Sequence, residues 1–264
     1  MIRIGPAGTA GMGYPAALEE IKKHGLSALE VEFTYGVRMA RHDAEEIGNK
    51  AAELGITLSV HAPYYINLAS SEKDKVQASV KRILDSCEKA ELLGARYVVF
   101  HAGFYQDKTA EETYSRISEQ IDVLHDKIKE NSWKVRLAPE VTGKPSQFGS
   151  LNELLMLRKD TGCHLTIDFA HLKARQQGAI DYQDVIDTIN KAKPKLDHIH
   201  SHFSGIEWTE KGEKRHIITS EDAITPFLES VFKNRLDITI INESPEPFDD
   251  CLKMKDILSH IRQD

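Results

Sequence analysis

The stretch AAELGITLSVHAP, residues Ala51 to Pro63, contains the repeating unit that decides the fold. It ends a helical pattern, turns at a glycine and continues as a short apolar strand that stops on His61. The same order recurs in IKKHGLSALEVEF (21–33), AELLGARYVVFHAG (90–103) and LRKDTGCHLTIDFAH (157–171). One glycine in each copy is expected to adopt the left-handed conformation that ends a helix: Gly25, Gly55, Gly94 and Gly162.

Short strands and helices alternate through the whole chain. The predicted strands lie near Ile2–Gly5, Ala28–Phe33, Leu58–Ala62, Tyr97–Ala102, Val135–Val141, His164–His171, His198–Phe203 and Ile238–Glu243. Helical patterns separate them, the clearest over Lys73–Leu93, and one closes the chain over Phe248–Arg262. The strands are short, apolar and β-branched, as parallel strands covered on both faces should be.

Eight strand–helix units predict an α/β fold, a (β/α)8 TIM barrel, in one domain spanning residues 1–264. A doubly wound open sheet is the alternative. The glycine-rich run GPAGTAGMG after the first strand is too irregular for a dinucleotide-binding fingerprint.

Composition narrows the functional classes. No apolar run is long enough to span a bilayer, and the N-terminus lacks the pattern of a signal peptide. The three cysteines are far apart and form no C-x-x-C pair, which suits a reducing cytoplasm and argues against disulfides. Taken alone, the net charge of −7 disfavours binding to nucleic acid. Bound divalent cations can reverse that sign locally.

Metal-ligand side chains stand at or just beyond the expected strand ends, where barrel enzymes carry their chemistry. They are His61, His101, Glu140, Asp168, His171, a histidine of strand seven, His216 and Glu243. For each residue alone, a hydrogen-bonded strand end is the simpler interpretation. Together, so many imidazoles and carboxylates would be costly to desolvate without cations. Eight nitrogen and oxygen ligands are too many for one ion and predict two or three metals.

The motifs HAPYYINLAS, HAGF, PEVTGK, DFAH, KRH and NESP follow one another at these strand ends. Together they resemble the endonuclease IV family of apurinic/apyrimidinic endonucleases, within the xylose-isomerase-like barrels. The resemblance runs from about Ile2 to Glu243, and HAPYYINLAS is its most specific part. It implies a monomeric enzyme of DNA base excision repair that hydrolyses the backbone of double-stranded DNA 5′ to an abasic site. It also implies Zn2+ as cofactor, two or three per chain, with Mn2+ as the alternative.

The resemblance also assigns the ligands. The first metal would be held by His61, His101 and Glu140. The second would share Glu140 and add Asp168, Glu243 and a histidine of strand seven. The third would take His171 and His216.

Two assignments stay open. For the strand-seven histidine we predict His202, with His200 as the alternative, whereas His198 is expected to be structural. At the third site the family has an aspartate two residues before His216, and this chain has Lys214. A protonated lysine cannot bind zinc, so this site uses the adjacent Glu213, binds weakly or is missing.

The same resemblance implies how DNA is bound and cut. Glu140 would position the attacking water and accept its proton. Arg38 would enter the duplex near the lesion and Tyr64 would wedge beside it. The simpler interpretations are a solvated arginine and a tyrosine packed on the barrel rim.

Sugar isomerases and epimerases of the same barrel superfamily are the alternative function. They hold one metal with counterparts of Glu140, Asp168, Glu243 and a strand-seven histidine. They do not need the four additional histidines together, and this surplus favours the nuclease: His61, His101, His171 and His216.

Overall fold

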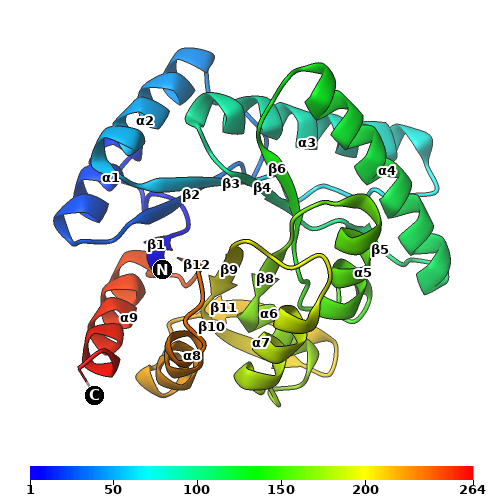
Figure 1. Ribbon diagram of the computed structural model, residues 1–264. Helices are drawn as coiled ribbons and strands as arrows, with labels where there is room; N and C mark the ends of the chain where they lie inside the picture. Colours follow the sequence, from blue (N-terminus) through cyan, green and yellow to red (C-terminus); the bar gives the residue numbers. More distant parts are fainter. Residues whose placement is uncertain (264) are drawn as a thin grey trace.

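A computed structural model describes residues 1–263 and shows eight parallel strands arranged as a barrel inside a ring of helices (Figure 1). The barrel strands are β1 (Ile2–Pro6), β2 (Ala28–Glu32), β3 (Thr57–His61), β4 (Tyr97–Phe100), β6 (Arg136–Pro139), β8 (Thr166–Asp168), β9 (Ile199–Phe203) and β12 (Ile238–Asn242). The helices are α1 (Tyr14–Lys23), α2 (Arg41–Leu54), α3 (Lys73–Leu93), α4 (Ala110–Glu130), α5 (Leu151–Thr161), α6 (Phe169–Arg175), α7 (Tyr182–Lys191), α8 (Glu221–Lys233) and α9 (Pro247–Ile261).

Two four-stranded parallel sheets form the barrel wall, in the orders β1-β12-β9-β8 and β2-β3-β4-β6. Single bridges join them at Ala7–Glu30 and at Glu140–Thr166, so the wall closes. The predicted (β/α)8 barrel is therefore confirmed. Among residues 1–263, none of the helices combines the length and apolar character needed to cross a lipid bilayer.

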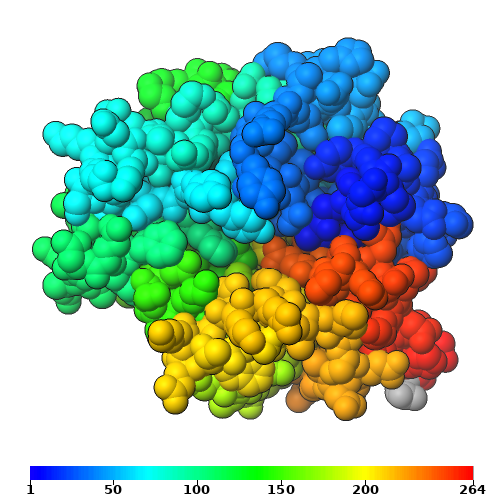
Figure 2. All heavy atoms as spheres, turned by 180° about the vertical axis from the view of Figure 1, so that it is seen from behind, coloured from blue at the N-terminus to red at the C-terminus, as the bar shows by residue number. Residues whose placement is uncertain are grey.

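Two antiparallel strand pairs lie at the mouth of the barrel. The larger is a hairpin of β10 (Gly205–Thr209) and β11 (Gly212–Ile217), and the smaller joins β5 (Gly103–Phe104) to β7 (Gln147–Phe148), with α4 and β6 between them in the sequence. Figure 2 shows the reverse face, where the yellow hairpin segment lies below the cyan and orange segments that follow β3 and β12. The segment Trp208 to His216 is thus mostly strand.

The predicted element positions hold, with one informative error. The strand expected over His164–His171 ends at Asp168, and residues from Phe169 onward form α6. The Asp168 carboxylate accepts the backbone N–H of His171 at 2.8 Å and so caps the new helix. The four predicted helix-ending glycines all have positive φ, between 65° and 77°. The predicted domain ran to residue 264, which lies outside the described residues.

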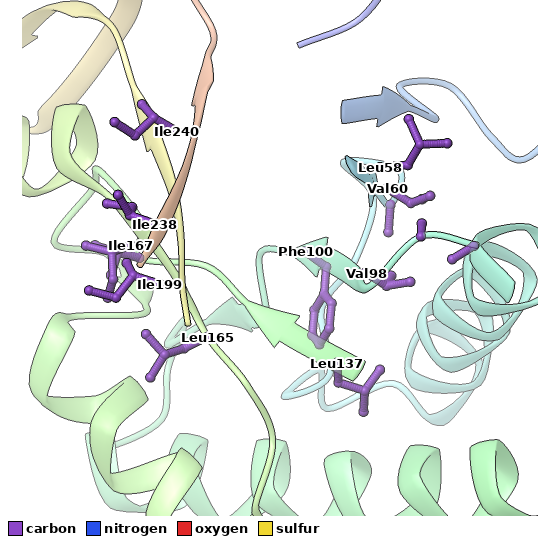
Figure 3. Packing of buried hydrophobic residues seen from close by; sticks show 14 of the residues in the cluster. Leu58, Val60, Val98, Phe100, Leu137, Leu165, Ile167, Ile199, Ile238 and Ile240 are labelled. Carbon is purple, nitrogen blue, oxygen red and sulfur yellow. The ribbon is translucent and has the colours of Figure 1, made fainter. Parts of the chain in front are cut away.

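Strand alternation separates an apolar outer face from a largely polar inner face. On β3, Leu58 and Val60 join the large core between strands and helices. Figure 3 shows these two with similar buried side chains on or beside β4, β6, β8, β9 and β12. The inward positions of the same strand are Ser59 and His61. Helix packing therefore holds the wall, while the interior is free to carry polar chemistry.

Gly5 allows β1 and β2 to approach closely where the two sheets meet. A β-carbon at Gly5 would stand 1.8 Å from the carbonyl oxygen of Ala28, so the backbone would have to move. We expect Gly5→Ala to lower the free energy of unfolding by about 3 kcal/mol or more. Gly162→Ala is the control because its site is open and only its φ of 77° is unfavourable.

For that control we expect a loss of about 1 kcal/mol. Urea unfolding followed by circular dichroism measures both values. Equal losses in the two variants would contradict the close-approach explanation.

Candidate metal centre

Glu140, which follows β6, is the centre of the site and is 1% exposed. Its Oε2 lies 3.2 Å from Nε2 of His61 and 3.0 Å from Nε2 of His101. Its Oε1 lies 2.9 Å from Nδ1 of His202 and 3.4 Å from Nδ1 of His171. Burial alone would raise the pKa of Glu140, but His202 and His101 outweigh it and hold that pKa well below its usual range.

The ligand atoms form three contiguous groups, each with its members within 4.8 Å of one another. The first group is His61, His101 and Glu140. The second is Glu140, Asp168, His202 and Glu243. The third is Asp168, His171 and His216. The structure thus brings together every residue that the resemblance assigned to a metal, and it adds Asp168 to the third group.

A buried oxygen without a partner supports the fit of cations to this site. Asp168 is fully buried, and its Oδ2 accepts no hydrogen bond from the described residues, although Nδ1 of His171 lies 3.1 Å from it. Such an orphaned carboxylate oxygen is costly unless a cation or water completes it. Asp168 belongs to both the second and the third group, so it is placed to serve either ion.

Hydrogen bonds fix the orientation of the imidazoles. The Nδ1–H of His61 donates to the carbonyl oxygen of Ala62 at 2.8 Å, and that of His171 donates to Val141 at 2.9 Å. A carbonyl oxygen can only accept, so the proton is on Nδ1 and Nε2 is left to bind. Metal-binding histidines commonly show this arrangement.

Electrostatics also favour cations here. Burial, together with the carboxylates of Glu140 and Asp168, raises the pKa of Glu243 to about 8, although His202 acts against this rise. Burial lowers the pKa of His61, but Glu140 outweighs it and raises that pKa to about 9. Positive ions would favour the carboxylate form of Glu243 and the neutral form of His61, which are the binding forms.

A bulge in the hairpin decides the third group. Trp208 pairs with Glu213 and Glu207 pairs with Arg215, so Lys214 is an extra residue in β11. The bulge shifts the strand phase, and Glu213 and His216 both line the same cavity although they are three residues apart.

Lys214 takes no part in the site. Its Nζ bonds to Glu207 at 2.7 Å and its side chain is 53% exposed. Glu213 instead brings its Oε2 within 3.4 Å of Nε2 of His171. Of the alternatives left open by the sequence, Glu213 is therefore the one whose side chain is in place.

The remaining strand-seven histidines lie deeper in the barrel. His200 hydrogen-bonds to Glu30 at 3.0 Å and lies outside the groups that contain Glu140. His198 hydrogen-bonds to Thr239 at 3.0 Å, as expected of a structural residue. The structure thus places His202, and not His200, against Glu140.

Six of the eight assigned ligands, all except Asp168 and His202, line a cavity of about 290 Å³ at the barrel mouth. Tyr64 lines it, is 56% exposed, and has its ring 5.9 Å from that of His61. Arg38 lines a second cleft of about 650 Å³ between α1 and α2. Glu32 lies in the walls of both cavities.

Sequence reasoning missed Glu30 and Glu32 on β2. Glu30 is fully buried beneath the site, and Glu32 lines the cavity. A signal was present in ALEVEF, where acidic residues alternate with apolar ones in a strand that is otherwise suited to a core. Glu30 and Glu32 are two residues apart on one strand, so both side chains point to the same face, the inside of the barrel.

A family model described as xylose isomerase-like TIM barrel matches residues 18–259. The chain belongs to this family. An uncharacterized protein of Methanocaldococcus jannaschii is 36% identical over 266 residues, covering 94% of this chain and 95% of that relative. A probable endonuclease 4 of Mycobacterium ulcerans is 29% identical over 211 residues, which cover 78% of each protein.

Several solved structures share this fold. Endonuclease IV from Thermus thermophilus has a TM-score of 0.76 at 22% identity, covering 99% of this chain and 100% of that one. A D-tagatose 3-epimerase-like protein has a TM-score of 0.75 at 18% identity, and the match covers 99% of this chain and 97% of that one. The similarity to endonuclease IV proteins expected from the motifs is confirmed, and the barrel itself is common to nucleases and epimerases.

The bulged hairpin leads to a prediction about metal content. We expect Glu213→Gln to weaken the binding of one zinc ion by about tenfold or more, because a carboxylate beside His171 is lost. Lys214→Gln, which changes the next residue on the opposite face, should bind zinc like the wild type. Competition with a chromophoric chelator measures both. Equal zinc affinity in the two variants would show that Glu213 does not complete the third group.

Proposed function

We propose that the chain is a metal-dependent endonuclease that hydrolyses the phosphodiester bond 5′ to an abasic site in double-stranded DNA. The observation that carries the proposal is the set of three contiguous ligand groups that share Glu140 and Asp168. A barrel that binds one ion for sugar chemistry does not need the groups formed with His61, His101, His171 and His216. The likeness to a probable endonuclease 4 supports the same class.

The ligand set has no sulfur and mixes imidazoles with carboxylates, which suits zinc or manganese. Two or three such ions supply Lewis-acid chemistry, because they acidify a water and neutralise phosphate oxygens. Glu140 and Asp168 would each serve two neighbouring ions. Glu213 would complete the third position together with His171 and His216.

The chain's own residues supply proton transfer and orientation. Glu140 has four imidazoles around its two oxygens, which holds the carboxylate rigidly in the ionised form. An ionised carboxylate in that position can orient the attacking water and accept its proton. The capping bond that Asp168 accepts from the backbone N–H of His171 fixes His171 beside Glu140.

Exposed aromatic residues on the rim support the binding of an opened duplex. Tyr64 stands over the cavity, and Tyr35 and Tyr65, in the segments that follow β2 and β3, are 77% and 66% exposed. Exposed aromatic rings can stack on bases exposed by an extruded nucleotide. Arg38, in the adjoining cleft, would enter the duplex beside the lesion.

A sugar isomerase or epimerase is the second candidate. The group formed by Glu140, Asp168, His202 and Glu243 is sufficient to hold one ion for moving a proton beside a carbonyl. This candidate predicts about one metal per chain and no role for the hairpin residue Glu213.

The two functions give different outcomes in one experiment. We expect the purified protein to contain two or three divalent ions per chain and to nick a synthetic duplex 5′ to a single abasic analogue. EDTA should slow the nicking, and added zinc or manganese should restore it. Interconversion of a keto sugar, with one ion per chain and no nicking, would overturn the endonuclease proposal in favour of the isomerase.

Glu140→Gln tests the shared carboxylate directly. The substitution keeps the shape of the side chain but removes its charge, so we expect nicking to fall by about 100-fold or more. Binding of the abasic duplex should survive, since Tyr64 and Arg38 are unchanged. Glu119→Gln, an exposed residue on α4, is the control for the charge change. Nicking at the wild-type rate would exclude Glu140 from the reaction.

A further inference from the structure

His202 differs from His61, His171 and His216 in the group that its second ring nitrogen, the one turned away from the candidate metal, contacts. Backbone carbonyls accept from His61 and His171, and the hydroxyl of Ser204 lies 2.6 Å from Nδ1 of His216. His202 instead has Nδ1 toward Glu140 and Glu243, at 2.9 and 3.1 Å. Its Nε2 points into the barrel interior and lies 2.9 Å from Oε1 of Glu30.

The protonation of the His202 ring and its burial explain why Nε2 needs Glu30 as an acceptor. If Nδ1 of His202 binds a cation, the proton of the neutral ring must be on Nε2. That N–H is fully buried, and a buried donor without an acceptor is costly. Neither Nε2 of His202 nor Oε1 of Glu30 has another hydrogen-bond partner among residues 1–263. With the metal on Nδ1, the N–H on Nε2 and Oε1 of Glu30 are therefore placed to satisfy each other.

Glu30 is itself held in place from the far side. Its Oε2 accepts the hydroxyl of Ser59 at 2.6 Å and lies 3.0 Å from Nε2 of His200. Glu30 is fully buried, and an ionised carboxylate survives such burial only with partners of this kind. Residues of β2, β3 and β9 thus form one continuous connection below the cavity: Ser59, Glu30, His200 and His202.

We propose that Glu30 is a positioning residue that sets the proton and the ring orientation of His202 and thereby strengthens binding of the metal shared with Glu140. A carboxylate behind a metal-binding imidazole raises the basicity of the ring, and loss of such a partner typically weakens metal binding about 10- to 100-fold. Ser59 and His200 act indirectly, because their contacts fix the carboxylate of Glu30. The inference rests on the proposed metal centre but not on which reaction the centre performs.

The test measures zinc affinity without any substrate. We expect Glu30→Gln to weaken binding of one zinc ion about 10- to 100-fold in chelator competition, with the remaining ions unaffected. Ser59→Ala keeps the carboxylate and should give a smaller weakening in the same direction. Glu53→Gln, an exposed carboxylate on α2, is the charge-matched control and should bind like the wild type.

A spectroscopic measurement on the unaltered protein covers the case in which Glu30→Gln does not fold. In zinc-loaded, nitrogen-15-labelled wild type, His202 should carry its proton on Nε2 and have the metal on Nδ1. The opposite tautomer would overturn the proposal, as would wild-type zinc affinity in a folded Glu30→Gln variant. A wild type that binds no divalent ion would overturn the metal centre as well, whereas zinc binding without nicking would reject only the endonuclease function.

Discussion

The site depends on one buried carboxylate shared by four imidazoles. Glu140 is surrounded by His61, His101, His171 and His202, which come from four separate segments of the chain. Such a concentration of titratable groups away from water is unfavourable unless every charge has a partner. The barrel makes the arrangement attainable, because its helices hold the wall from outside and leave the inner positions to polar residues.

Bound cations would resolve the remaining charge imbalance. Asp168 has an unsatisfied buried oxygen, and burial together with the carboxylates of Glu140 and Asp168 raises the pKa of Glu243 to about 8. These features fit a centre that is complete only with bound ions, because positive charge satisfies the orphaned oxygen and favours the carboxylate form. The distribution of ligands into three groups with shared carboxylates is the physical basis for preferring phosphodiester hydrolysis over single-metal sugar chemistry.

The interior below the mouth extends the site. Glu30, Ser59 and His200 lie on inward-facing positions where a barrel of this size would otherwise carry aliphatic side chains. Their hydrogen bonds lead toward His202, so the polar interior and the metal centre form one connected unit. The hairpin contributes from the opposite side, where the bulge at Lys214 turns Glu213 into the cavity.

The sequence by itself determined the barrel and most of the ligand set. Repetition of helix, glycine and strand predicts the fold through local conformational preferences, and strand-terminal residues such as His61 and Glu140 must meet at one mouth once the strands are parallel. Three features required the tertiary structure. The register of β9 against its neighbours selects His202 over His200, and Asp168 ends its strand early by capping a helix. The bulge at Lys214, which turns Glu213 toward the site, arises from the pairing of β10 with β11. Because a bulge reverses which side chains face inward, this orientation cannot be predicted from the sequence of β11 alone.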